Sequence, residues 1–360
     1  MKHHNTFCYS FPAVRGQQAG RPFYIATCPL RTIPKIFIFD EEEVPPELRA
    51  QRELNKQRIP AMTRYLVENP SDYIFSALTA SVDKGVSFES PQDNPDMGML
   101  HVQMDSNILI NDGQHRRKAI EEAIKEKPEL GQDNIAVVFF IDEELKRSQQ
   151  MFVDLNQNSI RPSSSLNVLY DHRDSCSAIA RHLSSKIKPF VGYTEMERSS
   201  IAPKSPKLFT LSGIKHATRA LVGKGTKDKF NESDDAIATN FWKTLNKYIS
   251  EWQLVQNKEI SPSQMRQEYI HAHGIGLHAL GVAGHQLLED YPDNWEEKLP
   301  VLTKLDWRKA NPIWNNRALH NGKLSKSSTN IKLTANVIKR ELGLVLSEDE
   351  LKLEKLLIND

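Results

Sequence analysis

Apolar and polar side chains alternate between residues 100 and 104, as is typical of a half-buried strand. Residues 107–110 form a short apolar run that predicts a second strand. Apolar positions within residues 119–124 recur with the helical period. The continuous apolar run of residues 135–141 predicts a strand covered on both faces, and residues 142–156 predict a further helix. Strand, turn, helix, strand and helix in this order favour an α/β arrangement.

The flanking regions are patterned less clearly. Before residue 100, β-forming residues predict strands at 24–28, 35–39 and 73–82, and helices are expected over 47–58 and 61–68. After residue 175 the chain becomes rich in Pro, Ser and Gly, which predicts loops around a short helix near residues 214–221. The expected fold class is therefore α+β or α/β, with an α/β domain at 1–175, a basic junction at 176–230 and a mostly helical region at 231–360.

Composition narrows the class of protein. The chain has 360 residues, of which 39% are hydrophobic and 26% charged, as in ordinary globular proteins. Three cysteines without a CxxC pair argue against a disulfide framework and a cysteine-built zinc site, and predict a reduced, cytosolic setting. The first residues lack the apolar core of a signal peptide, and no stretch approaches the roughly 18 consecutive apolar residues of a membrane span, so no membrane partner is expected.

Charge is distributed unevenly along the chain. The totals of 47 basic and 46 acidic residues exclude a strongly basic protein that binds nucleic acid through its net charge. Residues 181–229, however, hold eleven Lys or Arg and three acids, which predicts a surface that binds a polyanion. The alternative is a solvated loop whose lysines keep it soluble. The candidates for contact with DNA in this segment are Lys186, Lys188, Lys204, Lys207, Lys215, Arg219, Lys224 and Lys227.

A second basic group lies in the predicted helix at 47–58. Arg49, Arg52 and Lys56 fall within one or two turns of each other and are further candidates for contact with DNA. The alternative is that they form the wet side of an ordinary helix. The last twenty residues are the opposite in sign, with six acids and two lysines, so we consider them as a contact for partner proteins.

The sequence ILINDGQHRRKAIEEA marks a point where a strand becomes a helix. Unpaired N–H groups at a helix N-terminus favour anions, and glycine permits the turn that brings them to a ligand. Arginine supplies forked donors to a phosphate, Asp112 can cap the helix or hold a metal ion, and His115 can act as acid or base. The alternative is simple capping with solvated arginines. The candidate phosphate-binding or nucleotide-binding residues here are Asp112, Gly113, Gln114, His115, Arg116 and Arg117.

A second polar cluster follows the helix predicted at 142–156. Asn156, Gln157, Asn158 and Arg161 offer many hydrogen bonds and little apolar surface, so they join the phosphate-binding candidates. Helix capping accounts for Asn158 and one of the following serines but leaves Asn156 and Gln157 unexplained. Farther along, His271, His278 and His285 are seven residues apart, too far on a helix to converge on one metal ion, and a packed helix is expected there.

Several motifs in order resemble the DGQHR-domain proteins and, within them, the DndB regulators that accompany bacterial DNA phosphorothioation. The motifs are RAQRELNKQRI at 49–59, YIFSALTASVD at 73–83, DGQHRR at 112–117, FVDLNQN at 152–158, HGIGLHALGVAG at 273–284 and DWRKANPIW at 306–314.

The resemblance implies a transcriptional repressor that binds double-stranded DNA near the promoter of its own modification genes. The DGQHR domain is similar to the ParB and sulfiredoxin group, whose comparable corner handles nucleotide phosphates. That similarity places a nucleotide at Gly113–Arg117, with residues 156–158 nearby. No cofactor is required; a nucleotide with Mg²⁺ is the one considered. The competing hypotheses are a nucleotide hydrolase or nuclease that uses Asp112 and either Arg116 or Arg117, and a subunit that docks other phosphorothioation proteins. Catalytic residues stay unassigned, and no metal site is expected.

Overall fold

The computed structural model describes residues 7–37, 56–142, 150–151, 154–155 and 162–358. The chain forms two compact units, Met1–Ile160 and Arg161–Asp360, each with its own buried apolar core. The sequence predicted a boundary after residue 175, but the helix that starts at residue 164 already packs within the second unit. Among the described residues, no helix is both long and apolar enough to cross a membrane.

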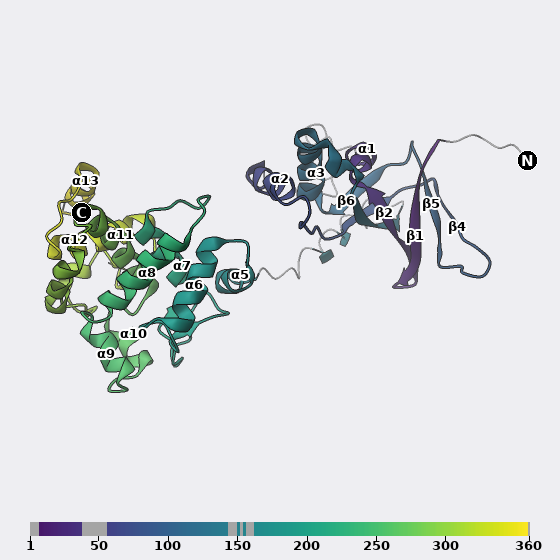
Figure 1. The fold of residues 1–360 in the computed structure, drawn as a ribbon. Coiled ribbons are helices and arrows are strands. Elements are labelled where there is room, and N and C mark those ends of the chain that lie inside the picture. Colours follow the sequence, from purple (N-terminus) through teal and green to yellow (C-terminus); the bar gives the residue numbers. More distant parts are fainter. Residues whose placement is uncertain (1–6, 38–55, 143–149, 152–153, 156–161, 359–360) are drawn as a thin grey trace, which may run out of the picture. The chain divides into compact units, whose positions relative to one another are not determined.

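The first unit is built on a seven-stranded sheet with the order β4-β5-β1-β2-β7-β3-β6 (Figure 1). Neighbouring strands are antiparallel except β3 and β7, which pair in parallel. The strands are β1 Cys8–Gln18, β2 Arg21–Pro29, β3 Leu78–Val82, β4 Val86–Glu89, β5 Met97–Gln103, β6 Ile108–Asp112 and β7 Asn134–Ile141.

Helices cover one face of this sheet. They are α1 Ile33–Ile36, α2 Ile59–Glu68 and α3 Gln114–Glu126, with 3₁₀ turns η1 Leu30–Thr32, η3 Lys56–Arg58 and η4 Pro128–Gln132. Leu66 and Ile120 from the helices share a core with Ala26 and Val137 from the strands. The opposite face is open, because alternate residues such as Ile25 are exposed. Residues of β7 likewise alternate between buried positions and exposed or half-buried ones, so the prediction that this strand is covered on both faces is wrong.

Two further predictions for the first unit need correction. The predicted strand at 35–39 is helical at Lys35 and Ile36, and residues 38–39 lie outside the described part. Pro34 opens this short helix, and Ile33, Ile36 and Phe37 bury their side chains at helical spacing, which the alternating letters IFIF concealed. The strands β1 and β4 were not predicted.

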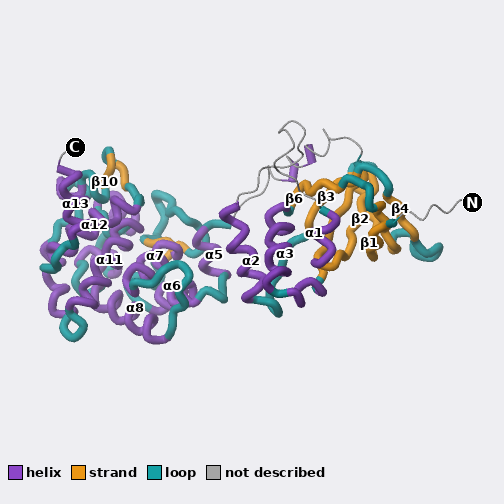
Figure 2. Tube along the Cα trace, turned by 90° about the horizontal axis from the view of Figure 1, so that it is seen from above, coloured by secondary structure: helices purple, strands orange, loops and turns teal. Residues whose placement is uncertain are grey.

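The second unit is mostly helical, as predicted (Figure 2). Its helices are α5 Ser164–Tyr170, α6 Ser175–Lys186, α7 Leu211–Val222, α8 Glu232–Leu245, α9 Ser250–Gln256, α10 Pro262–Glu268, α11 Gly274–Asp290, α12 Ser328–Glu341 and α13 Glu348–Ile358. The 3₁₀ helices are η5 Trp295–Lys304 and η6 Pro312–Trp314, and the short strand pairs are β8 Thr194–Glu195 with β9 Phe209–Thr210 and β10 Leu319–His320 with β11 Lys323–Leu324. Residues 176–230 are thus an integral part of this unit, because α6 and α7 contribute to its core.

Helices α7 and α11 lie side by side in the same direction. A Cβ atom built on Gly281 would lie 2.2 Å from the carbonyl oxygen of Ala217, and one on Gly284 would lie 2.8 Å from Leu221. Residues of α11 therefore face residues of α7 in the same order along both helices, which makes the pair parallel. Only glycine allows such a close approach of two backbones. The consequence is that both helices begin at the same end of the second unit.

Candidate anion-binding sites

The predicted strand-turn-helix corner is present in the first unit. Strand β6 ends at Asp112, α3 begins at Gln114, and Gly113 joins them with a φ of 113°. A Cβ atom on Gly113 would lie 2.4 Å from the Leu78 side chain, so both the backbone conformation and the space require glycine. Gln114 is buried and donates to the carbonyl oxygen of Ile110 at 3.3 Å, and His115 lies partly buried in the first turn of α3.

Arg116 is held by groups of its own unit. Its guanidinium donates to Asp112 Oδ2 at 2.6 Å, in an ion pair between residues four apart, and also to Ser76 Oγ. The Arg116 side chain is 17% exposed, so little of it faces solvent. Asp112, proposed from the sequence as a cap or a magnesium ligand, forms an ion pair with this arginine, and those two roles stay predictions.

All three nitrogens of the Arg117 guanidinium group donate hydrogen bonds within the first unit. Its Nε and Nη2 donate to the carbonyl oxygens of Phe37 and Pro34, both at 3.0 Å, and its Nη1 pairs with Glu121. These bonds tie α3 to the segment that contains α1. The corner brings Asp112–Arg117 together as predicted, but both guanidinium groups already have carboxylate partners. Phosphate binding and hydrolysis at this corner therefore stay predictions, as do the roles of Asn156, Gln157, Asn158 and Arg161, which lie outside the described residues.

The basic candidates of residues 181–229 divide into engaged and exposed side chains. Lys215 forms an ion pair with Asp174, and Lys224 with Asp234. Lys207 Nζ donates to the carbonyl oxygen of Gly192 at 3.0 Å. Arg219, a residue of α7, is partly buried. The exposed candidates are Lys186, Lys188, Lys204 and Lys227.

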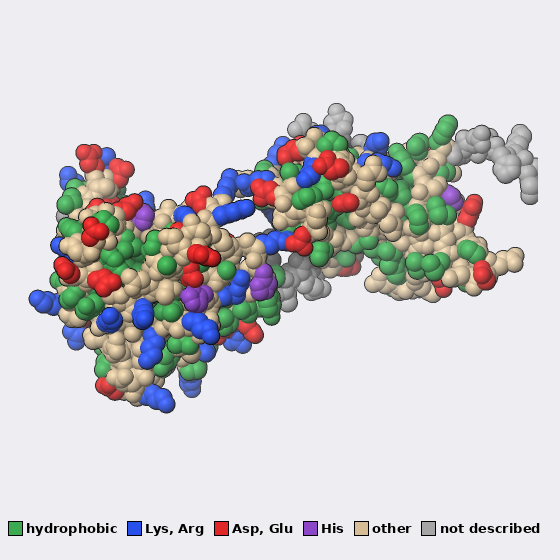
Figure 3. All heavy atoms as spheres, in the orientation of Figure 1, with side chains coloured by type: hydrophobic (Ala, Val, Ile, Leu, Met, Phe, Trp, Pro, Cys, Tyr) green, Lys and Arg blue, Asp and Glu red, His purple; other side chains and the backbone are tan. Residues whose placement is uncertain are grey.

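These exposed lysines lie at two ends of α7. The loop after α6 packs on the residues just before α7, since Phe190 contacts Phe209 at 5.5 Å between ring centroids, so Lys186 and Lys188 lie near the start of α7. Lys227 follows the end of α7, about 18 Å away along a helix of this length. On the face of the second unit that Figure 3 shows, basic side chains lie at several separate places, mostly among uncharged ones. Of the other group, Lys56 is exposed in the first unit, and Arg49 and Arg52 lie outside the described residues.

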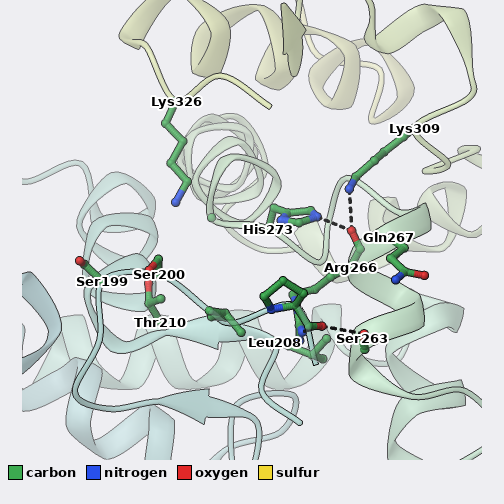
Figure 4. A pocket seen from close by; sticks show the side chains of 13 residues that line it. Ser199, Ser200, Leu208, Thr210, Ser263, Arg266, Gln267, His273, Lys309 and Lys326 are labelled. Atoms are coloured by element: carbon green, nitrogen blue, oxygen red, sulfur yellow. Dashed lines mark hydrogen bonds between the residues drawn. The ribbon is translucent and has the colours of Figure 1, made fainter. Parts of the chain in front are cut away.

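A basic cavity that the sequence did not predict lies at the start of α11. It has a volume of about 390 Å³. Its basic residues are Arg266, His273, Lys309 and Lys326, which converge from different segments (Figure 4). None of the described residues that line it is acidic. A neighbouring cavity of about 350 Å³ shares Lys326 and Gly274 with the first, and the residues described in its lining likewise include no acid.

Among the described residues, the Arg266 guanidinium group donates hydrogen bonds to carbonyl oxygens and to no carboxylate. This buried group donates to the carbonyl oxygens of Ala202 at 3.0 Å, Pro203 at 2.7 Å and Ser205 at 3.0 Å, and to that of Lys207. Carbonyl oxygens satisfy the hydrogen bonds but leave the positive charge uncompensated. Burial lowers the pKa of Arg266 from its ordinary value, as expected for such a charge.

Two further basic side chains point at the backbone of Arg266. Lys309 Nζ lies 2.6 Å from its carbonyl oxygen, and His273 Nε2 lies 2.7 Å from the same atom (Figure 4). Burial lowers the pKa of Lys309, and the charge of Arg266 adds to this effect. Burial, together with the charge of Lys309, lowers the pKa of His273 to about 4, so this imidazole is neutral at pH 7.

The ends of two helices add to the positive potential. Helix α7 begins beside Thr210, whose hydroxyl caps it by accepting from the N–H of Gly213 at 3.1 Å, and α11 begins at Gly274 after His273, whose side chain does not cap it. Both starts line the cavities, and since the two helices are parallel their dipoles add there. His216 and His278 stack with centroids 6.3 Å apart at the second cavity, and burial lowers the pKa of His278 to about 4.

Two other candidates from the sequence make contacts within the second unit, and the role of the acidic tail as a partner contact stays a prediction. His271 lies before α11, fully buried, and its Nε2 is 3.3 Å from Glu251, so the three histidines at 271, 278 and 285 do not share one helix. The described part of the chain contains no group of three or more His, Cys, Asp or Glu side chains placed to hold a metal ion. In the acidic tail, Glu354 pairs with Arg317 at 2.6 Å.

Comparison with known proteins gives one family. The family model of DndB, described as DNA-sulfur modification-associated, matches residues 11–345. No curated protein and no solved structure matches the chain. The predicted similarity of the first unit to ParB therefore stays a prediction.

Proposed function

Since the chain belongs to the DndB family of proteins associated with DNA-sulfur modification, we propose that it is a DNA-binding repressor of genes for DNA phosphorothioation. The family match covers nearly the whole chain and relates both units to this modification. Repression requires a surface that holds the duplex, and the phosphate backbone supplies most of the attraction in such complexes.

The observation that best supports the proposal is the group of exposed lysines near the start of α7. Lys186, Lys188 and Lys204 have no acidic partner among the described residues, in contrast to Lys215 and Lys224. Lys204 lies in the same loop as the carbonyl groups that Arg266 holds, so its backbone position is defined. Unpaired cations on ordered backbone attract phosphates without first having to break an internal ion pair.

Binding of the full chain to a fragment of its own promoter tests the proposal. We expect the logarithm of the affinity to fall linearly with the logarithm of the salt concentration. The variant K186A/K188A/K204A should have a slope smaller by about 0.9 for each phosphate that it no longer neutralises. Lys125→Ala is a matched control, because this exposed lysine pairs with Glu121 and Glu122.

Two results would contradict the proposal. An affinity that does not depend on salt would exclude phosphate contacts, and equal affinity for the promoter and for a shuffled fragment of the same length would exclude an operator-specific repressor. The same measurement on R49A/R52A would show whether this predicted group contributes. Weaker binding there, with normal binding in the lysine triple variant, would move the DNA contact to the first unit.

A further inference from the structure

The basic cavities at the start of α7 and α11 have no part in the proposed DNA binding. The lysines proposed to contact DNA, Lys186, Lys188 and Lys204, line neither cavity. We infer that they form a site for a small phosphorylated molecule of nucleotide size, whose terminal phosphate lies between Lys326 and the first turn of α11.

The first argument is the balance of charge in the lining. Arg266, Lys309 and Lys326 carry three positive charges around one cavity, and its described lining holds no carboxylate. Elsewhere in the second unit, the buried Lys339 pairs with Glu350 at 2.5 Å and the half-buried Arg317 pairs with Glu354 at 2.6 Å, whereas the buried Arg266 has only carbonyl partners among the described residues. Several uncompensated cations at one place destabilise the fold unless an anion binds among them.

The second argument is the position of Lys326. A Cβ atom built on Gly274 would lie 3.0 Å from Lys326 Nζ, so this ammonium group lies over the first residue of α11. A helix N-terminus carries partial positive charge, so a lysine placed there is repelled. A phosphate between them accepts from the Lys326 ammonium group and from backbone N–H groups that His273 does not cap. The absence of a side chain at Gly274 leaves room for it.

The third argument concerns the size and chemistry of the space. The main cavity of about 390 Å³ is within the usual range for small-molecule sites and continues towards the neighbouring cavity at Lys326 and Gly274. The hydroxyl-bearing residues Ser199 and Thr210 line both, which suits a hydroxylated body such as a sugar. Leu208 provides an apolar wall in the main cavity.

Calorimetric titration of the full chain with inorganic phosphate and with AMP tests the inference, with adenosine as the control that lacks phosphate. We expect phosphate and AMP to bind, AMP more tightly, and adenosine not to bind. Lys326→Ala should weaken the binding of AMP about tenfold or more, as expected for loss of a hydrogen bond between charged groups. Lys243→Ala removes an exposed lysine of α8 outside the lining and should leave the binding unchanged.

A second variant separates binding from folding. Gly274→Asp places a tethered carboxylate at the first position of α11, where it stabilises the helix N-terminus and occupies the position of the ligand phosphate. We expect the melting temperature to stay the same or rise while AMP binding is abolished. Binding of adenosine as tight as that of AMP, or AMP binding unchanged in both Lys326→Ala and Gly274→Asp, would overturn the inference. Neither result would affect the proposed DNA binding, which the salt slope measures separately.

Discussion

The two places where a helix begins beside clustered cations differ in one respect, the partners of those cations. At the corner of the first unit, Arg116 and Arg117 have carboxylate partners in Asp112 and Glu121. At the start of α11 in the second unit, Arg266 and Lys309 bond only to carbonyl oxygens among the described residues. A carboxylate cancels charge, whereas a carbonyl group satisfies geometry and leaves the charge in place.

The comparison shows how little a local cluster of basic residues says about anion binding. The DGQHRR sequence places two arginines at a helix start, and the fold uses them to fasten α3 to neighbouring segments. The cavity of the second unit assembles its cations from residues as far apart as 266 and 326, and no short motif marks it. The charge that stays available for a ligand is the charge that the fold does not itself compensate.

The largest expected effect is on the stability of the first unit, at the corner where both arginines have carboxylate partners. Arg117→Ala would remove two hydrogen bonds to buried backbone and leave Glu121 without its closest partner, so we expect the first unit to lose about 3 kcal/mol of its free energy of unfolding. Hydrogen exchange of the amides of β7 measures this unit separately. The five tryptophans cannot report it, because all follow residue 240.

Arg116→Ala is the matched variant at the same corner. Its partner Asp112 is 44% exposed, so solvent can replace much of the missing ion pair, and a decrease of about 1 kcal/mol is expected. A stability of the first unit that is insensitive to Arg117→Ala would mean that the corner's charges are not committed to the fold. The contrast with the second unit would then fail.

The next effect concerns the parallel pairing of α7 and α11, which places the starts of both helices at the basic cavities of the second unit. Alanine in place of glycine normally stabilises a helix by about 1 kcal/mol. At Gly281 we expect the opposite, a decrease of about 2 kcal/mol, because the added methyl group would lie 2.2 Å from the carbonyl oxygen of Ala217.

Unfolding followed by tryptophan fluorescence measures this effect in the second unit, which contains every tryptophan of the chain. Gly274→Ala in the same helix is the control, since its methyl group would meet only the movable end of Lys326. Equal changes in the two variants would show that α7 and α11 do not approach as closely as described. The inference that the dipoles of α7 and α11 add at the basic cavities would then lose its support.

Much of the first unit could be predicted from sequence because its elements are marked by local patterns. The alternation at 100–104 and the helical period at 119–124 correspond to β5 and α3, and the tight turn at Gly113 lies where predicted. Strand β1 was missed because only Phe11 and Ala13 of its eleven residues are buried, so it has almost no apolar pattern. Its place in the sheet depends on pairing with β2, which follows it directly, and with β5, which is far away in sequence.

The site in the second unit could not be predicted for a different reason. The packed helix expected around HGIGLHALGVAG is α11, and its Gly281 and Gly284 permit close packing. The sequence does not show that the partner is α7 or that the two helices run in parallel. Nor does it show that Arg266 lacks a carboxylate, since Glu268 lies two residues away along the chain but does not line the cavity. Compensation of charge is a property of the folded chain.

The smallest expected effect is the response of the basic cavities of the second unit to pH. The folded pKa of His273 is about 4, below an unfolded value of about 6.5, so unfolding takes up protons between these values. Stability is therefore full above pH 6.5 and falls as the pH decreases towards 4. Between pH 6.5 and 5.5 the contribution of His273 to this decrease is about 1 kcal/mol, and Arg266, Lys309 and Lys326 are the charged groups that oppose its protonation. His278, whose pKa is also about 4, contributes a similar amount, which stays the same in a variant at residue 273.

A bound phosphate should reduce this decrease in stability, because its negative charge offsets those cations and raises the pKa of His273. Tryptophan fluorescence during unfolding at pH 6.5 and 5.5, with and without phosphate, measures both effects. His273→Gln removes the titrating group and keeps an N–H donor for the carbonyl oxygen of Arg266, so the pH dependence should become shallower. At the corner of the first unit added phosphate should change nothing, since its arginines already have carboxylate partners, and hydrogen exchange of the β7 amides measures this unit. If phosphate changed the stability of both units equally, cations with carboxylate partners would not differ from cations that have only carbonyl partners.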